Sequence, residues 1–261
     1  MPQTSWSSSE TSGSLLQNVP QLLLLACLEV GPAFSEMVLR PVLPEQLQDG
    51  VPGYTLTYFP VRGRAEHIRL LCWDQGVPLT EDEVQMQDWA SGKGDLKKNA
   101  VFGQLPKFQD GDFVIYQSNT ILRYLGRKHG LSGSNDQEHT TIDMINDGVE
   151  DLRLKYYRFL FLENEANKEK FLQDLSGQLA AFERILSQNP KGPNYLVGDK
   201  ISYADYNLLD TLHCNLDLSP ECLSSFPLLS AYVEHLVSRP KLSEYLKSDG
   251  RKKRPITPKH K

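Results

Sequence analysis

The stretch YTLTYFPVRGR at residues 54–64 marks the start of the folded part of this chain. Its first five residues alternate aromatic or aliphatic side chains with threonine, which is the period-two pattern of a β-strand. Pro60 and Gly63 end the strand. Residues 65–75 then carry apolar side chains at helical spacing up to Gly76, a natural helix C-cap. The sequence therefore predicts a strand followed directly by a helix.

The next sixty residues continue to alternate predicted strands and helices. A second short strand is expected around residues 83–86, and the glycine-rich stretch 92–103 is expected to be an irregular loop. A hairpin is predicted from residues 106–109 and 113–117, with Asp110-Gly111 as the turn. Ser118 is predicted to cap a helix over residues 119–129. This order predicts a small α/β domain over residues 53–132.

Residues 133–250 have a helical pattern throughout. Apolar residues from Ile142 to Phe159 recur at spacings of three and four, which predicts one long amphipathic helix. Ser202 and Asp205 form a capping-box-like start for a later helix, with Asp in place of the usual Glu. Further helices are predicted over residues 168–188, 203–216, 226–237 and 240–247. We therefore expect an all-α second domain, followed by a basic tail over residues 251–261.

Residues 1–52 are rich in Ser, Gln, Pro and Leu without a sustained period, so they are predicted to be a disordered extension. The apolar run at residues 19–27 is far shorter than the roughly 20 residues of a membrane-spanning helix. A signal peptide would carry Lys or Arg ahead of that run, and residues 1–18 contain neither. Met37 is an alternative start site. No membrane association is expected.

Charge and cysteine content argue against several classes of function. The net charge of the chain is −5, and the last eleven residues hold six Lys/Arg and no acid, so residues 1–250 carry −11. An acidic body argues against nucleic-acid binding, which needs clustered cations on a folded surface. The four cysteines show neither a C-x-x-C pair nor metal-ligand spacing. We expect a reducing compartment, with no disulfide framework and no metal site.

Tyr58 is the first candidate for chemistry. A phenol at a strand end that faces a helix N-terminus is well placed to donate to a thiolate, and the positive helix end favours the same anion. Its spacing from Tyr54 and Leu56 equally fits a core stripe. Spacing alone favours the core interpretation.

A second candidate cluster combines Gly103-Gln-Leu-Pro106 with Gln117-Ser118. A cis peptide before Pro106 would expose the backbone of Leu105 to an extended peptide. Ser118 at a helix start would bind a carboxylate through its hydroxyl and backbone N–H. A tight turn and an ordinary N-cap are the simpler alternatives.

Six motifs taken together resemble the pi class of cytosolic glutathione transferases over residues 53–247. They are YFPVRGR, FGQLPKFQDGD, YQSNTILRYLG, NDGVEDLR, LVGDKISYADYNLLD and FPLLSAYV. The resemblance implies a thioredoxin-like N-terminal domain, an all-α C-terminal domain and a homodimer in the cytoplasm. It also implies a detoxifying transferase that uses glutathione as co-substrate and needs no further cofactor.

The resemblance assigns roles to individual residues. Tyr58 would be the catalytic hydroxyl that donates to the glutathione sulfur. Asp151 would reach across the dimer to the γ-glutamyl ammonium, although a solvated helix face is the simpler interpretation of an acid there. Phe102 would be an aromatic plug inserted into the partner. The remaining glutathione-binding residues would be Arg64, Trp89, Lys97 (or Lys98, because this loop is two residues longer than usual), Gln104, Leu105, Pro106, Gln117 and Ser118.

The sequence also departs from the family. Ala65 and Ala100 stand where the family commonly has reactive cysteines, so thiol-based regulation is not expected. Phe59, Val61, Tyr157 and Phe161 match positions that line the second-substrate site, and Phe161 lacks the tyrosine hydroxyl often found there. That loss should affect additions to epoxides or enones more than aromatic substitution. The basic tail replaces a neutral end and is expected to be solvated.

Two other functions would have their own sequence signatures. A non-catalytic ligand-binding or regulatory protein on the same fold would be indicated by loss of Tyr58 or Arg64, and both are present. A disulfide reductase would need an active-site cysteine near residues 58–65, and none is there. The sequence therefore favours conjugation of glutathione to apolar electrophiles.

Overall fold

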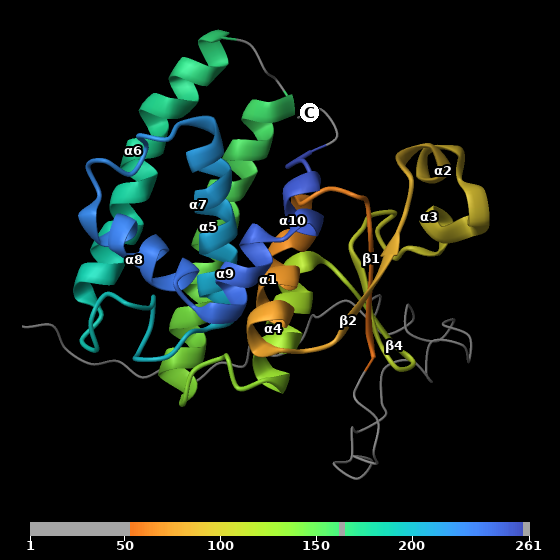
Figure 1. Ribbon diagram of the computed structural model, residues 1–261, viewed down its shortest axis with the longest axis horizontal. Helices are drawn as coiled ribbons and strands as arrows, with labels where there is room; N and C mark the ends of the chain where they lie inside the picture. The colour runs from red at the N-terminus through yellow and green to blue at the C-terminus, as the bar shows by residue number, and fades with distance from the viewer. Residues whose placement is uncertain (1–52, 162–164, 258–261) are drawn as a thin grey trace, which may run out of the picture. The chain divides into compact units, whose positions relative to one another are not determined.

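The computed structural model describes residues 53–161 and 165–257 of the chain. The predictions for residues 1–52, including the apolar run and Met37, lie outside this part. The described chain begins with a four-stranded sheet flanked by helices and continues as a group of helices (Figure 1). The expected fold class, an α/β domain followed by an all-α domain, is confirmed.

The sheet has the strand order β2-β1-β3-β4. The central strand β1 (Tyr54–Tyr58) pairs in parallel with β2 (Leu79–Glu83) and antiparallel with β3 (Lys107–Asp110), which pairs with β4 (Phe113–Tyr116). All residues of β1 except Thr55 are buried. A parallel pair needs a crossover helix, and α1 (Glu66–Gln75) supplies it, ending at Gly76 as predicted.

Two predictions in this domain were wrong in detail. The second strand lies at residues 79–83 instead of 83–86, because the parallel register places Leu79 beside Tyr54 and Glu83 beside Tyr58. The stretch 92–103 is not an irregular loop throughout. It contains the short helices η2 (Lys93–Asp95) and α3 (Leu96–Asn99), and α2 (Met86–Ser91) precedes them.

The helix α4 (Ser118–Lys128) also differs from its prediction. It begins at Ser118 itself, and the Ser118 side chain does not act as the cap. Gln117 occupies the capping position with a φ of 71°, an uncommon backbone conformation for a residue other than glycine. Ser118 is buried. The first turn of α4 therefore has no side-chain cap for its backbone N–H groups.

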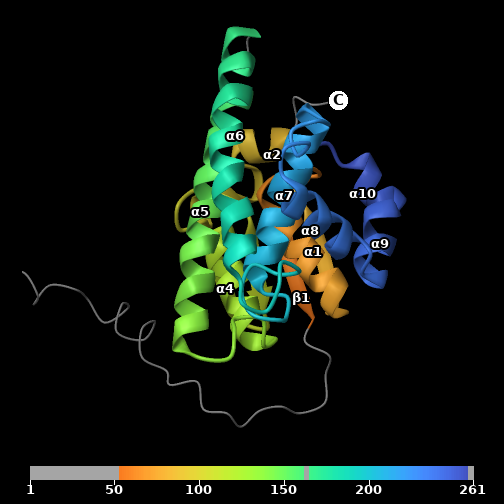
Figure 2. The same ribbon diagram turned by 90° about the vertical axis from the view of Figure 1, so that its left-hand side faces the viewer.

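The helical part is built around α7 (Tyr203–Leu218), in which twelve residues are buried. It packs against α1, α4, α5 (Asp136–Phe161) and α8 (Pro227–Val237). Figure 2 shows α5 and α6 (Glu165–Gln188) lying side by side. The predicted capping box at the start of α7 is present, and the Asp205 carboxylate accepts from the Ser202 N–H at 2.7 Å.

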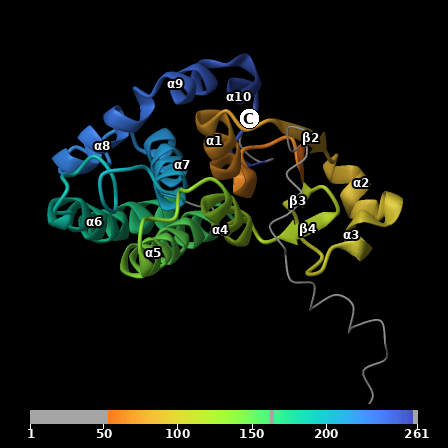
Figure 3. The same cartoon turned by 90° about the horizontal axis from the view of Figure 1, so that it is seen from below.

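The C-terminal segment returns to the first domain. After α9 (Pro240–Lys247), the short helix α10 (Asp249–Lys253) lies beside α1 (Figures 1 and 3). The expectation that the basic tail is solvated was wrong for Arg251 and for residues 254–256, whereas Lys252 and Lys253 are exposed. Arg251 and Arg254 form ion pairs with acids of the first domain, and Ile256 is buried. Residues 258–261 lie outside the described part.

Candidate active site

Tyr58 ends β1 with its hydroxyl directed at the start of the next element. The short helix η1 (Gly63–Ala65) follows, and the backbone N–H of Arg64 donates to the Tyr58 Oη at 3.0 Å. The approach is close because residue 63 has no side chain. A Cβ at Gly63 would lie 2.6 Å from the Tyr58 Oη, and the φ of this residue is +42°. Since the phenol oxygen accepts this bond, its own proton remains free for donation.

The protonation state of this phenol follows from its surroundings. Burial raises the pKa of Tyr58 above its ordinary value of 10, while the Arg64 N–H and the guanidinium groups of Arg64, Arg69 and Arg153 oppose the shift. Tyr58 is therefore a neutral phenol near pH 7. A neutral phenol donates a hydrogen bond to an anion without giving up its proton.

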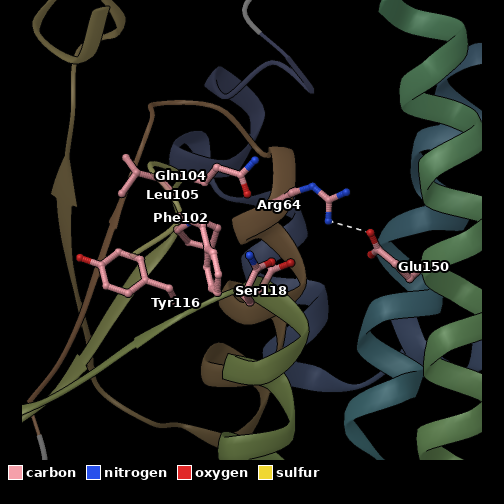
Figure 4. Close-up of a pocket in the computed structure, with 9 residues that line it drawn as sticks. Arg64, Phe102, Gln104, Leu105, Tyr116, Ser118 and Glu150 are labelled. Atoms are coloured by element: carbon pink, nitrogen blue, oxygen red, sulfur yellow. Dashed lines mark ion pairs between the residues drawn. The ribbon is translucent and has the colours of Figure 1, made fainter. Parts of the chain in front are cut away.

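A polar cavity of about 180 Å³ lies next to Arg64 (Figure 4). The residues before β3 form one wall, and the Leu105–Pro106 peptide bond is cis. The end of β4 and the start of α4 form another wall. The lining residues are Arg64, Phe102, Gln104, Leu105, Pro106, Tyr116, Gln117, Ser118 and Glu150. One cation, two side-chain amides and a helix N-terminus suit a ligand that carries carboxylates.

A larger, mainly apolar cavity of about 610 Å³ lies between the strand–helix loop after β1 and helix α5. Its lining residues are Tyr58, Phe59, Val61, Gly63, Arg64, Met86, Leu154, Tyr157, Arg158, Leu160, Ile256 and Thr257. Arg64 lines both cavities, and its guanidinium lies 5.5 Å from the centroid of the Tyr157 ring. The two cavities thus share the boundary where Tyr58 and Arg64 meet.

Comparison with known proteins agrees with this arrangement. A sequence model of the glutathione S-transferase N-terminal domain matches residues 54–127, and a model of the C-terminal domain matches residues 150–249. The chain is 68% identical to glutathione S-transferase P 1 of Xenopus laevis, over 81% of this chain and all of the relative. It is 72% identical to glutathione S-transferase P 2 of Bufo bufo, over 78% of this chain and 97% of the relative.

A solved structure gives the same answer. The pi-class glutathione S-transferase of Onchocerca volvulus is 42% identical and superposes with a TM-score of 0.73, over 78% of this chain and 97% of that chain. The chain belongs to the pi class of glutathione S-transferases. The resemblance inferred from the six motifs is confirmed.

Most of the predicted site residues of this glutathione transferase line one of the two cavities. Arg64, Gln104, Leu105, Pro106, Gln117 and Ser118 line the polar cavity. Phe59, Val61 and Tyr157 line the apolar cavity beside Tyr58. Phe161 ends α5, and its side chain lies outside the described part.

Three predicted residues do not line the polar cavity. Trp89 packs edge-on against Phe59, with ring centroids 5.8 Å apart, and Lys97 is exposed on α3. Asp151 is exposed and lines a shallow apolar groove between α5 and α6. The roles of these three residues in the transferase remain predictions.

Several lining residues are not among the sequence predictions. Glu150 is one of them, yet its Oε1 lies 2.8 Å from Arg64 Nη1, as the dashed line in Figure 4 shows. Ile256 and Thr257 were assigned to a solvated tail. The only available signal was that Pro255 and Ile256 directly follow four consecutive cations.

A buried ionic cluster connects the two domains of the transferase. Arg153 Nη1 donates to Asp210 Oδ2 at 2.8 Å, and its Nη2 donates to the Asn207 carbonyl and Oδ1 at 3.1 and 2.8 Å. His67 of α1 lies with its Nδ1 3.6 Å from the same Asp210 oxygen. Burial, followed by the nearby Arg153 charge, lowers the pKa of His67 to about 4, so His67 is neutral at pH 7.

Cysteines are absent from both cavities in the described part of the transferase. The described thiols, Cys72, Cys214 and Cys222, are free, and none of them lines either cavity. Burial raises the pKa of Cys72 to about 12, so this thiol is neutral near pH 7. Within residues 53–161 and 165–257, no helix combines the length and apolarity required to cross a bilayer.

Proposed function

We propose that this protein conjugates the glutathione thiolate to apolar electrophiles, with the Tyr58 phenol as the activating donor. The observation that carries the proposal is the 3.0 Å bond from the Arg64 N–H to the Tyr58 Oη at the boundary between a polar and an apolar cavity. That bond orients the phenol and leaves its proton available. A thiolate placed at this boundary would receive the proton's hydrogen bond and face the apolar cavity.

Glutathione would occupy the polar cavity. The tripeptide carries two carboxylates and one ammonium, so it needs both cationic and anionic partners. Ser118 and the backbone N–H groups at the start of α4 suit one carboxylate, and the Leu105 backbone suits the extended peptide. Trp89 and Lys97 are proposed for the glycyl end. Asp151 of the partner subunit is proposed for the ammonium.

The chemical step then needs little from the protein beyond these contacts. The glutathione thiol loses its proton to solvent, because the Tyr58 hydrogen bond stabilises the thiolate and lowers the thiol pKa from its ordinary value near 8.5. The sulfur attacks an electrophilic carbon held in the apolar cavity and forms a C–S bond. In a substitution the leaving group departs with the bonding electron pair. In an addition the electrons move to the adjacent atom, which takes a proton from solvent. No resident cofactor or metal is proposed.

A homodimer is proposed to complete the site. Phe102 is 63% exposed, so its ring is accessible to a partner subunit. The groove between α5 and α6 offers an apolar socket, lined chiefly by Met144, Ile145, Gly148, Ala181, Phe182 and Ile185. Insertion of Phe102 of the partner subunit into this groove would cover both surfaces. Asp151 lines the same groove, which supports its proposed role beside the dimer contact.

The cytoplasm is proposed as the location. The three described cysteines are all unpaired, as expected in a reducing compartment. No observation favours the non-catalytic alternative, since Tyr58 and Arg64 are both present and in contact.

The proposal is tested by a conjugation assay with glutathione and an activated aryl chloride, using the full chain. Tyr58→Phe should lower kcat by roughly 10²-fold while the glutathione KM stays within about twofold, because one donor to a developing or bound anion is lost. Tyr54→Phe is the matched control. It removes a hydroxyl from the same strand, where the partner is His129 at 3.1 Å, and it should leave kcat unchanged. Equal turnover in Tyr58→Phe and the unaltered protein would reject the proposal.

A further inference from the structure

Residues 249–257 are the last described segment of the chain. The end of this C-terminal segment lines the apolar cavity, which is otherwise formed by much earlier residues. Helix α10 begins after Ser248, whose Oγ accepts the Arg251 N–H at 3.2 Å. The chain then extends across the first domain. Ile256 is 4% exposed, and Ile256 and Thr257 line the apolar cavity beside Tyr58 and Gly63.

Two backbone hydrogen bonds attach this segment to the loop that follows Tyr58. The Arg62 N–H donates to the Pro255 carbonyl at 2.8 Å, and the Gly63 N–H donates to the Ile256 carbonyl at 3.0 Å. The loop therefore forms one side of the apolar cavity and the extended C-terminal segment forms the neighbouring side. A shift of either would change the shape of the space above the Tyr58 hydroxyl.

Three ion pairs, made by two arginines, fix the segment from its other end. Arg254 Nη2 lies 3.0 Å from Glu81 Oε2 and 3.1 Å from Glu83 Oε1, both on the edge strand β2. Arg251 Nε lies 3.2 Å from the Oε1 of Glu66, a fully buried acid of α1. The arginines flank the turn from α10 into the extended segment. They therefore determine where Pro255 begins to cross the first domain.

We propose that Arg254 is a positioning residue for the second substrate. By bridging Glu81 and Glu83, it holds residues 255–257 as a wall of the apolar cavity and thereby raises the affinity for apolar electrophiles. This inference rests on the proposed use of that cavity for the electrophile. None of residues 251–257 lines the polar cavity, so the position of glutathione does not depend on this wall.

The choice of Arg254 over Arg251 follows from burial. Removal of Arg251 would leave the buried Glu66 carboxylate short of one partner, and that loss would disturb folding. The side chains of Arg254, Glu81 and Glu83 are 16%, 21% and 43% exposed, and Glu81 keeps Arg69 as a second partner at 2.9 Å, so loss of Arg254 leaves no fully buried carboxylate without a cation. Arg254 variants therefore report on the wall and not on the stability of the domain.

The test measures steady-state kinetics of Arg254→Gln with an activated aryl chloride. The electrophile KM should rise roughly fivefold, while the glutathione KM and kcat stay within about twofold, because a partly exposed ion-pair network is modest in strength. The electrophile KM of Arg254→Lys should lie between those of Arg254→Gln and the unaltered protein, since a single ammonium cannot bridge two carboxylates as a guanidinium does. Lys253→Gln is the matched control, because it removes the same charge from an exposed neighbouring position and should change neither KM.

Salt gives a second readout that a purely structural role would not share. The Debye length falls to about 3 Å at 1 M ionic strength, so the difference in electrophile KM between Arg254→Gln and the unaltered protein should shrink as salt is added. Glu83→Gln removes one of the two partners and should raise the electrophile KM in the same direction. An unchanged electrophile KM in Arg254→Gln, or an equal rise in the glutathione KM, would overturn the proposal.

A third variant separates failure of this inference from failure of the cavity assignment. Leu154→Glu places a charge on an exposed position of the cavity wall, away from the C-terminal segment. A raised electrophile KM in Leu154→Glu with none in Arg254→Gln would reject the role of Arg254 alone. No change in either variant would show that the electrophile binds elsewhere.

Discussion

Arg64 and Glu150 join the two domains directly, through an ion pair of 2.8 Å between Arg64 Nη1 and Glu150 Oε1. Arg64 lies in η1, where its backbone N–H donates to the Tyr58 phenol, and Glu150 lies on α5. A further hydrogen bond of 3.1 Å from Asn119 Nδ2 holds the other carboxylate oxygen of Glu150. The guanidinium at the edge of the polar cavity is therefore held from the helical domain.

The first prediction concerns this contact. Glu150→Gln removes the charge that fixes Arg64 while keeping a side chain of the same shape. We expect the glutathione KM to rise about three- to tenfold with kcat changed by less than about twofold, because the ion pair is only partly exposed and serves binding. Asp147→Asn, on the same helix but outside the cavity, is the control and should leave the glutathione KM unchanged. An unaltered glutathione KM in Glu150→Gln would contradict the positioning role of this acid.

The second prediction uses the space between Gly63 and Tyr58. Gly63→Ala would place a Cβ 2.6 Å from the Tyr58 Oη, so either the phenol or the loop must move. A misplacement of roughly 1 Å at a catalytic group lowers turnover by about 10²-fold. We therefore expect the kcat of Gly63→Ala to fall by that factor.

Because Gly63 has a positive φ, alanine at this position also strains the backbone. A control variant must separate this strain from the clash with Tyr58. Gly92→Ala carries the same cost, because its φ is +73°, but it meets nothing within 4 Å. Gly92→Ala should lose a similar amount of stability and keep its kcat. If the two variants lost turnover equally, the clash with Tyr58 would not be the cause.

The sequence predicts the strands and helices that carry this site better than the contacts of its side chains. Alternation in β1 and the hairpin around residues 106–117 follow from local rules, because strand period and turn chemistry are encoded within a few residues. The orientation of the acids in NDGVEDLR is not encoded in this way. Successive helical residues point about 100° apart, so Glu150 and Asp151 face different surfaces, and only the packing of α5 shows which surface meets Arg64.

The C-terminal segment shows a second limit. Its four cations between residues 251 and 254 have the composition of a solvated tail. The acidic partners of Arg251 and Arg254 are Glu66, Glu81 and Glu83, which lie between 171 and 185 residues earlier and have no periodic relation to the arginines. Pairing over such a separation depends on the tertiary fold, so composition predicted the wrong environment.

The third prediction concerns assembly. Phe102→Glu would place a charge on the proposed plug, and a carboxylate is costly to bury in an apolar groove. We expect the dimer to dissociate at micromolar concentration, as measured by sedimentation velocity. Phe113→Glu, at another exposed aromatic position on β4, should stay dimeric. A Phe102→Glu protein that sediments as a dimer would refute the plug.

The fourth prediction follows from His67, which is fully buried, and His213, which is partly buried. Burial and nearby cations lower the pKa values of His67 and His213 to about 4, against 6.5 for each free group. Between pH 6.5 and 4 the unfolded chain binds these protons and the folded chain does not. The free energy of unfolding therefore falls as the pH falls through this window, by on the order of 2–3 kcal/mol for each histidine. The low pKa of Asp210 adds its own loss only below about pH 4.

The matching measurement is urea unfolding at pH 7, 6, 5 and 4 for the unaltered protein and for His67→Asn. Glu66 and Asp205 have raised pKa values and act in the opposite direction, so the comparison between the two proteins removes their shared contribution. His67→Asn should lose less stability between pH 6.5 and 4 than the unaltered protein, because the contribution of His67 is gone and the other histidines are shared. The difference should vanish above pH 7, apart from a constant packing cost. Parallel curves for the two proteins over the whole range would mean that His67 becomes protonated in the folded state, against the burial beside Arg153 that keeps it neutral.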